Sequence, residues 1–161
     1  MPSPPDSAAI RNSLIGHLLA DSQLAGLMPD GVYSDVARAG KKQYVIVSLV
    51  DSVDQPTYEG RAIESGLYLV KAVALNNAAA AEAAAARIDQ LIEDQFWTIA
   101  PGLDLMAAYR VAPIGALELD AVDPDLRWTH RGGRYRLDVA VTSPPPLGRT
   151  RGTDHLERAA S

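Results

Sequence analysis

Residues 76–97 read NNAAAAEAAAARIDQLIEDQFW, and this stretch decides the fold. Its eight alanines, interrupted only by Glu82, are the strongest helix formers, and the leading asparagine pair supplies acceptors for the N–H groups of a first turn. Its apolar residues recur three and four apart, so they form one stripe at a 3.6-residue period. The stripe consists of Ala81, Ala84, Ala85, Ile88, Leu91, Ile92 and Phe96.

Such a stripe predicts a helix that lies on a sheet. Its alanine half lets two backbones approach closely, whereas its isoleucine and leucine half fills a wider gap, so we expect the helix to lie tilted. The predicted helix–sheet core consists of Ala81, Ala85, Ile88, Leu91 and Ile92.

The chain has 161 residues, of which 47% are hydrophobic, and a formal charge of −5. This length suits a single domain with a sizeable core. The sequence contains neither an apolar run of about eighteen residues nor a signal-peptide pattern, so we expect a soluble protein without a membrane span. The absence of cysteine excludes disulfides and thiol chemistry, and the negative charge disfavours general nucleic-acid binding through a basic face.

Proline-rich segments bound the predicted domain. Residues 1–6, MPSPPD, are expected to form an extended arm because proline fixes φ and removes a hydrogen-bond donor. Three consecutive prolines at 144–146 end the domain, and residues 143–161 are predicted to be a flexible polar tail. A single α+β domain is therefore predicted for residues 7–142.

One amphipathic helix and two strands are predicted before the alanine-rich helix. The first helix ends near Ala20, where Asp21-Ser22 acts as a stop before a short turn. Strands are predicted at residues 43–51, QYVIVSLVD, which are few and dense in β-branched and aromatic residues, and at residues 66–75, GLYLVKAVAL. The polar residues 51–65 between them are interpreted as a long exposed loop, a kind of segment that is often functional.

Two more strands are predicted after the alanine-rich helix. Residues 103–119 contain Pro113 and Gly115, which indicate a bent or bulged strand at an edge. Residues 127–141 alternate as a strand, with Tyr135, Leu137, Val139 and Val141 on one face and Arg134, Arg136 and Asp138 on the other. We interpret Gly132-Gly133 as a bulge that resets the alternation. The predicted fold class is α+β in the order α-β-β-α-β-β, a four-stranded, mainly antiparallel sheet with two helices packed on one face.

The succession of these segments resembles a known family. The residues that carry the resemblance are 24–27 (LAGL), 31–35 (GVYSD), 43–48 (QYVIVS), Thr57, Gly60, 88–92 (IDQLI), 128–131 (WTHR) and 134–136 (RYR). Their order and spacing over residues 8–142 are similar to the tail-completion, or tail-terminator, proteins of long-tailed bacteriophages and related gene-transfer particles. The adjacent head–tail joining role stays open as an alternative within the same neck region.

The resemblance implies a virion structural protein of the tail or neck, assembled in the host cytoplasm. It implies a hexameric ring at the head-proximal end of the tail tube that ends tube polymerisation and presents the surface for head–tail joining. The implied partners are further copies of the chain, the tail tube protein and the head–tail connector or neck protein. DNA would pass through the lumen without specific binding, and no membrane or cofactor is involved.

The residues themselves point to no chemistry. His17, His130 and His155 lack the spacing of metal ligands, and no hydrolase, phosphate-binding or dinucleotide motif occurs. We therefore predict no catalytic, metal or cofactor-binding residue and no enzyme activity. The alternative function is a small ferredoxin-like α+β binding or oligomerisation module, which would pair through its sheet and carry an apolar pocket.

Charge is unevenly distributed along the chain. Arginines gather in residues 127–136, whereas acids outnumber bases in residues 51–65. Solvated faces and turns explain such a pattern equally well, but we hypothesise that the two segments lie on opposite flanks and meet between neighbouring copies. The candidate subunit or partner interface consists of Asp51, Asp54, Tyr58, Glu59, Arg61, Glu64, Arg131, Arg134 and Arg136.

Overall fold

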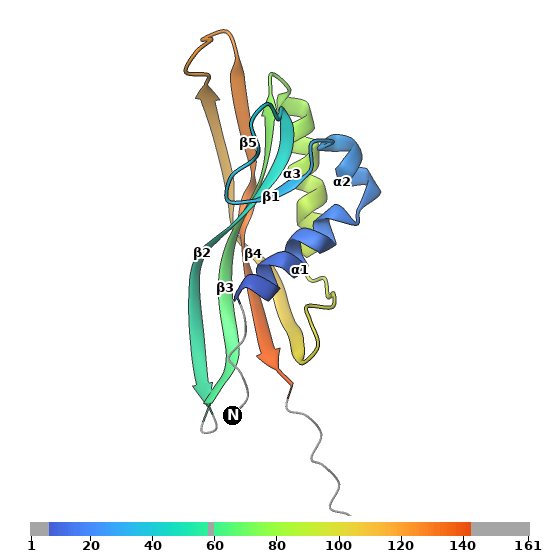
Figure 1. Ribbon diagram of the computed structural model, residues 1–161, viewed down its shortest axis with the longest axis vertical. Coiled ribbons are helices and arrows are strands. Elements are labelled where there is room, and N and C mark those ends of the chain that lie inside the picture. The colour runs from blue at the N-terminus through green and yellow to red at the C-terminus, as the bar shows by residue number, and fades with distance from the viewer. Residues whose placement is uncertain (1–6, 58–59, 143–161) are drawn as a thin grey trace, which may run out of the picture.

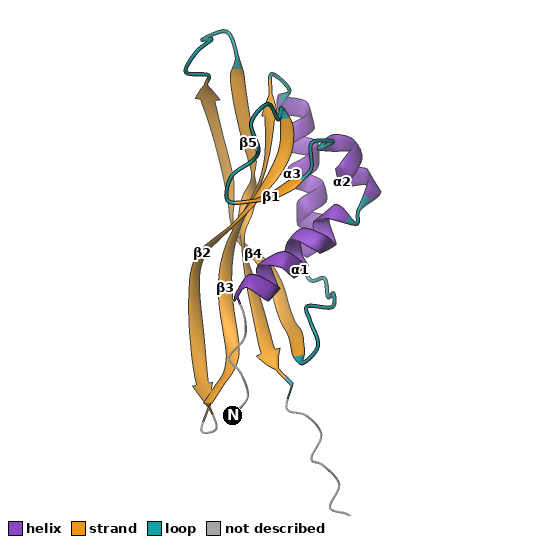
Figure 2. Cartoon of the chain, in the orientation of Figure 1, coloured by secondary structure: helices purple, strands orange, loops and turns teal. Residues whose placement is uncertain are grey.

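The computed structural model describes residues 7–57 and 60–142, so the predicted arm (1–6) and tail (143–161) lie outside the described residues. The elements are α1 (Ser7–Leu19), α2 (Ser22–Leu27), β1 (Val32–Ser34), β2 (Gln43–Thr57), β3 (Gly60–Leu75), α3 (Ala78–Ile92), β4 (Leu103–Leu119) and β5 (Arg127–Val141). The strands form one sheet in the order β1-β2-β3-β5-β4. The helices all lie on one side of this sheet (Figure 1, Figure 2).

The predicted four-stranded sheet with two helices is wrong. The described chain has a five-stranded mixed sheet and three helices, because β1 pairs in parallel with β2 and α2 follows α1. A three-residue strand has too few residues to show an alternation, and its pairing depends on hydrogen bonds to a distant segment, such as Val45 N–H to Gly31 O at 2.9 Å. The resulting order also differs from the β-α-β-β-α-β order of ferredoxin-like folds.

The predicted loop at residues 51–65 is wrong as well. Its described residues continue β2 and β3 into one long antiparallel hairpin, paired as far as Thr57 and Gly60. This hairpin projects beyond α1 at one end of the molecule, and the β4–β5 hairpin projects beyond α3 at the other (Figure 1). A projecting hairpin has little core against which to pack, so its sequence is polar and resembles that of a loop.

Helix α3 packs against β3 and β5 through a fully buried stripe. Asn77 caps the helix by accepting the Ala80 N–H at 3.1 Å, as expected, whereas the Asn76 side chain accepts the N–H of Arg127 at 2.8 Å and does not cap the helix. The helix ends at Ile92, earlier than expected, and Phe96 is therefore 68% exposed and not part of the stripe. The buried residues of α3 are Ala81, Ala84, Ile88 and Ile92.

Two of the predicted core residues of α3, Ala85 and Leu91, are only half-buried at the margins of the stripe. The sheet side of the core is formed by alternate residues of β2, β3 and β5, including Val47, Tyr68 and Leu137. No helix in the part of the chain that is described is long and apolar enough to cross a membrane.

No bulge occurs at Gly132-Gly133. The β3–β5 register runs without a shift from Ile63–Ala140 to Leu75–Trp128, so the alternation is never reset. The glycines instead allow close packing, since a Cβ on Gly132 would lie 2.0 Å from the carbonyl oxygen of Val70. β4 is an irregular edge strand, as expected, but its register shifts lie at Leu105/Ala107 and Arg110/Ala112, and the pairing runs without a shift through Pro113 and Gly115.

Candidate interaction surface

The face of the sheet opposite the helices is covered by no helix of the described chain, and we call it the open face (Figure 2). Side chains alternate between the two faces along each strand, so the residues between the buried core residues lie on the open face. From the three strands β3, β5 and β4 these residues include Leu67, Leu69, Lys71, His130, Arg134, Arg136, Tyr109, Ile114, Ala116 and Glu118.

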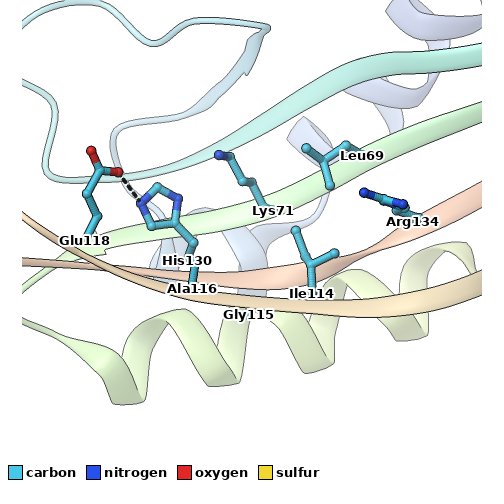
Figure 3. Close-up of a pocket in the computed structure, with 8 residues that line it drawn as sticks. All are labelled: Leu69, Lys71, Ile114, Gly115, Ala116, Glu118, His130 and Arg134. Atoms are coloured by element: carbon cyan, nitrogen blue, oxygen red, sulfur yellow. Dashed lines mark ion pairs between the residues drawn. The ribbon is translucent and has the colours of Figure 1, made fainter.

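A shallow hollow of about 300 Å³ lies on the open face, across β3, β5 and β4. Leu69, Ile114 and Ala116 supply apolar surface, and Lys71 and Arg134 supply positive charge (Figure 3). Neither cation forms an ion pair with another described residue. We call this hollow the open-face pocket; its chemistry suits an apolar group that carries negative charge beside it.

One end of the open-face pocket is closed by His130 and Glu118. The Nε2 atom of His130 lies 3.3 Å from a carboxylate oxygen of Glu118, which is itself 70% exposed. Burial, and then the positive charge of Lys71, lower the pKa of His130 below its ordinary value, so the ring is neutral at pH 7. No group of three His, Asp or Glu side chains among residues 7–57 and 60–142 is placed to hold a metal ion.

The predicted arginine cluster is divided between the two faces of the sheet. Arg134 and Arg136 lie on the open face, and Arg136 donates a hydrogen bond to the Ser65 carbonyl at 3.3 Å. Arg131 lies on the helix side, where its Nε is 3.9 Å from a carboxylate oxygen of Glu82 on α3. Because strand side chains alternate, Arg131 cannot share a surface with Arg134.

The predicted acidic residues do not form one flank either. Asp51 pairs with Leu67, which pairs with Arg136, so this acid and this base share one row of the open face, two strand spacings or about 10 Å apart. Asp54 lies on the helix side, opposite Glu64. Tyr58 and Glu59 lie outside the described residues, as does the side chain of Arg61.

Glu64 is a buried residue and not an exposed loop acid. Its side chain is 2% exposed, and one carboxylate oxygen accepts hydrogen bonds from the hydroxyls of Ser7 and, at 2.9 Å, Ser52. Ser7 is the first residue of α1, and Ser52 and Glu64 belong to β2 and β3. This carboxylate therefore connects the first helix to both strands of the β2–β3 hairpin. Together with burial, which is the larger cause, the Glu64 charge raises the pKa of the neighbouring Tyr68.

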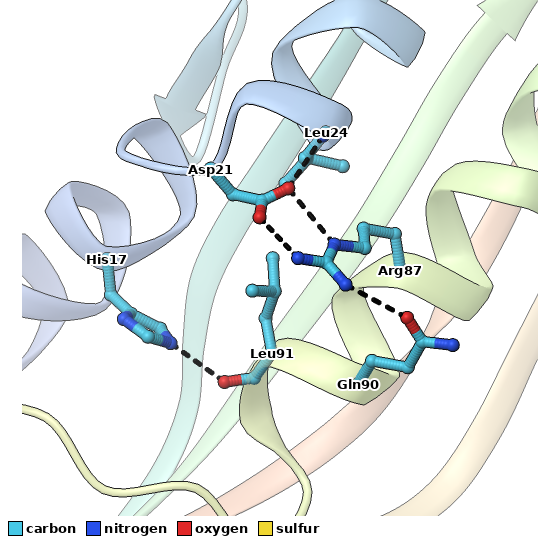
Figure 4. Close-up of polar contacts among 6 residues, drawn as sticks. All are labelled: His17, Asp21, Leu24, Arg87, Gln90 and Leu91. Atoms are coloured by element: carbon cyan, nitrogen blue, oxygen red, sulfur yellow. Dashed lines mark hydrogen bonds and ion pairs between the residues drawn. The ribbon is translucent and has the colours of Figure 1, made fainter.

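A second polar cluster lies on the helix side and joins α1, α2 and α3 (Figure 4). Arg87 donates to both carboxylate oxygens of Asp21, at 3.0 and 2.5 Å, and Asp21 also accepts the Leu24 N–H at the start of α2. His17 donates from Nε2 to the Leu91 carbonyl at 2.8 Å, and its ring stacks on Trp97 with the centroids 4.4 Å apart. The polar groups of these side chains form hydrogen bonds within the cluster, so its role is to hold the three helices together.

The Asp21–Arg87 pair makes stability depend on pH. The hydrogen bonds from Arg87 are the largest cause that lowers the pKa of Asp21 from 3.8 to about 2. A lowered folded-state pKa adds stability above the unfolded value, and this stability is lost as the pH falls through about 2. Asp21→Asn keeps a capping oxygen but loses the charge, so we expect it to cost about 1 kcal/mol at pH 7.

Urea unfolding of both proteins at a series of pH values measures this prediction. The difference in unfolding free energy between the wild type and Asp21→Asn should shrink between about pH 4 and pH 2, because protonation removes the charge of Asp21 in the wild type. The control is Asp35→Asn, since Asp35 is 57% exposed and its carboxylate lies 3.9 Å from Arg11; about 0.3 kcal/mol or less is expected there. If Asp21→Asn lost the same free energy of unfolding at every pH, the charge of Asp21 would not be the source of the stabilisation.

Leu69, Lys71, Ile114 and Ala116, which line the open-face pocket, were not among the interface residues predicted from the sequence. A weak signal was available in residues 66–75, where Leu67, Leu69 and Lys71 alternate with residues of the buried face. The residues of β4 and β5 that complete the pocket can be identified only from the pairing of these strands with β3 and with each other.

The fold is shared with solved structures at low sequence identity. One is a chain of the virion of a native gene transfer agent particle, with a TM-score of 0.57, 22% identity and coverage of 84% of this chain and 99% of that chain. A second is a protein whose description names no function, with a TM-score of 0.50, 15% identity and coverage of 87% and 98%. No family model and no curated protein matches the chain. At these identities the likeness shows the fold alone.

Proposed function

We propose that this chain is a structural subunit of a long-tailed phage or a related phage-like particle. It forms a ring at the head-proximal end of the tail tube, ends tube polymerisation and provides the surface for head–tail joining. The observation that carries the proposal is the fold shared with a chain of a gene transfer agent virion, which extends over 99% of that chain. The order and spacing of residues 8–142, which resemble tail-completion proteins, support the same role.

The geometry of the chain suits assembly with unlike surfaces in contact. The two hairpins project at opposite ends of the molecule, and the free edge of β4 lies at the opposite side of the sheet from β1 (Figure 1). A contact between two different surfaces of identical chains closes into a ring when its rotation closes. The proposed mechanism is therefore geometric: one ring face meets the last ring of the tube, the other meets the neck, and no second tube-like face allows further addition.

Electron microscopy of particles that lack this protein tests the proposal. Overlong tails are expected if the ring ends polymerisation, whereas tails of normal length without heads would assign the protein to joining alone. Supplying the wild-type chain in trans should restore tails of normal length that carry heads. Particles of normal length with heads attached, formed in its absence, would contradict the proposal.

A further inference from the structure

The turn that joins β4 to β5 presents an exposed aliphatic side chain from an ordered backbone. Val122 is 93% exposed, although Asp120 accepts the N–H groups of Val122 and Asp123, at 2.9 and 3.1 Å. The other oxygen of Asp120 accepts the indole N–H of Trp128 at 3.0 Å. Trp128 first, and then the two backbone N–H groups, lower the pKa of Asp120, so it remains charged in this capping role.

This turn, residues 120–126, is called the acidic tip because it carries Asp120, Asp123 and Asp125 without a basic residue. Single exposed apolar residues are ordinary on protein surfaces. The acidic tip differs because its backbone is held before any partner binds, which lowers the entropy lost on docking. Asp120 and Asp123 both use a carboxylate oxygen within the turn, and Asp125 is exposed beside them.

We propose that the acidic tip of one copy docks in the open-face pocket of the neighbouring copy, with Val122 on its apolar surface. The proposal rests on the ring assembly proposed above and names the contact that forms the ring. Leu69, Ile114 and Ala116 would receive the valine, and Lys71 and Arg134 would face the carboxylates beside it. A volume of about 300 Å³ is at the lower limit of binding pockets, which suits a side chain and its turn.

The tip cannot reach the pocket of its own chain. The β4–β5 ladder is paired as far as Leu119 and Arg127, so the tip lies beyond the end of a continuous hairpin. Glu118, at the end of the pocket nearest the tip, directly precedes Leu119. Ala116 and Ile114, which would receive the valine, lie three and five residues before Leu119, about 10 and 17 Å of strand. The occupant is therefore a second copy. A ring forms when each tip enters the pocket of the next copy, head to tail, whereas a reciprocal exchange of tips between two copies would give a closed dimer.

Cysteine cross-linking tests the contact directly, because the chain has no cysteine of its own. Full-length Val122→Cys and Ala116→Cys proteins, one lengthened by a tag, are mixed under mild oxidation and separated without reductant. A disulfide requires Cα atoms within about 7 Å, so it reports the docked geometry. The control pairs Val122→Cys with Ala83→Cys, the same substitution at an exposed residue of α3. We expect about tenfold more mixed dimer than in this control.

Native mass spectrometry of the same proteins, alone and with tail tubes, separates the two proposals. Oligomers without selective cross-linking would overturn the tip-to-pocket contact and leave the proposed function standing. The absence of oligomers under both conditions would overturn both proposals.

Charge exchange gives an independent readout of the same contact. Asp125→Lys leaves the two capping carboxylates in place and should raise the concentration for half-assembly about tenfold, through repulsion from Lys71 and Arg134. Adding Lys71→Glu to that variant should recover most of the loss. Asp104→Lys, at the far end of β4, makes the same charge change away from the tip and should leave assembly unaltered. Equal effects of the two lysine variants would overturn the contact.

Discussion

Replacing Gly132 with alanine is expected to cost about 3 kcal/mol of folding free energy, the largest loss we predict for a single methyl group. The new Cβ would lie 2.0 Å from the carbonyl oxygen of Val70 and 2.7 Å from the Cα of Lys71. Both are backbone atoms of β3, so relief requires that the β3–β5 ladder separate. This ladder forms the centre of the sheet, and the core beneath it would open as well.

Chemical unfolding followed by circular dichroism measures this loss as a lower denaturant midpoint. Gly16→Ala is the matched control, because nothing lies within 4 Å of the added methyl group and the site is inside α1. That change should stabilise the protein by about 0.5–1 kcal/mol, since alanine favours the helix. If Gly132→Ala unfolded at the wild-type midpoint, the close approach of β3 and β5 would be wrong.

Replacing Ala84 with leucine should cost about 2–3 kcal/mol, because α3 lies too close to the sheet to accept a larger side chain. Ala84 is fully buried, and so is Ala81 one turn earlier. Ala83→Leu places the same side chain on the exposed face of α3 and should change stability by about 0.5 kcal/mol or less. Thermal and urea unfolding of the two variants measure the difference, and equal stabilities would show that the alanine face is not packed as described.

Leucine at Ala85 provides an intermediate case between Ala84→Leu and Ala83→Leu. This residue was predicted to lie in the core, but in the structure it is half-buried beside Pro113 and Ile114 at the edge of the helix–sheet contact. A leucine there has room to turn outward, so we expect Ala85→Leu to fall between the other two variants. A stripe at a period of 3.6 residues cannot distinguish the centre of a contact from its margin, since both lie on the same side of the helix.

Local signals in the sequence predicted several elements correctly. Alanine content and an asparagine cap are sufficient to start α3, and both act within one helical turn. The alternation in residues 134–141 predicted which side of this half of β5 is buried, including Tyr135 and Leu137, because strand periodicity depends only on the backbone. Pro113 indicated an edge, since proline lacks the N–H that a central strand must donate.

The remaining features depend on residues far apart in the chain. Glu64 was assigned to an exposed interface because its neighbours in sequence are polar, yet Ser7, 57 residues away, helps to bury and satisfy it. The polar half of the β2–β3 hairpin and the short parallel β1 are strands because of their partners and not because of their composition.

The sequence by itself determined the alanine-rich helix, the cap that starts it and the buried side of the last strand, because propensity, capping and periodicity act over a few residues. Only the tertiary structure decided the five-stranded order, the separation of Arg131 from Arg134 and the pocket beside Lys71. Each of these requires a register between strands that are distant in sequence. A register is selected by the free energy of the whole assembled sheet, and no single segment contains it.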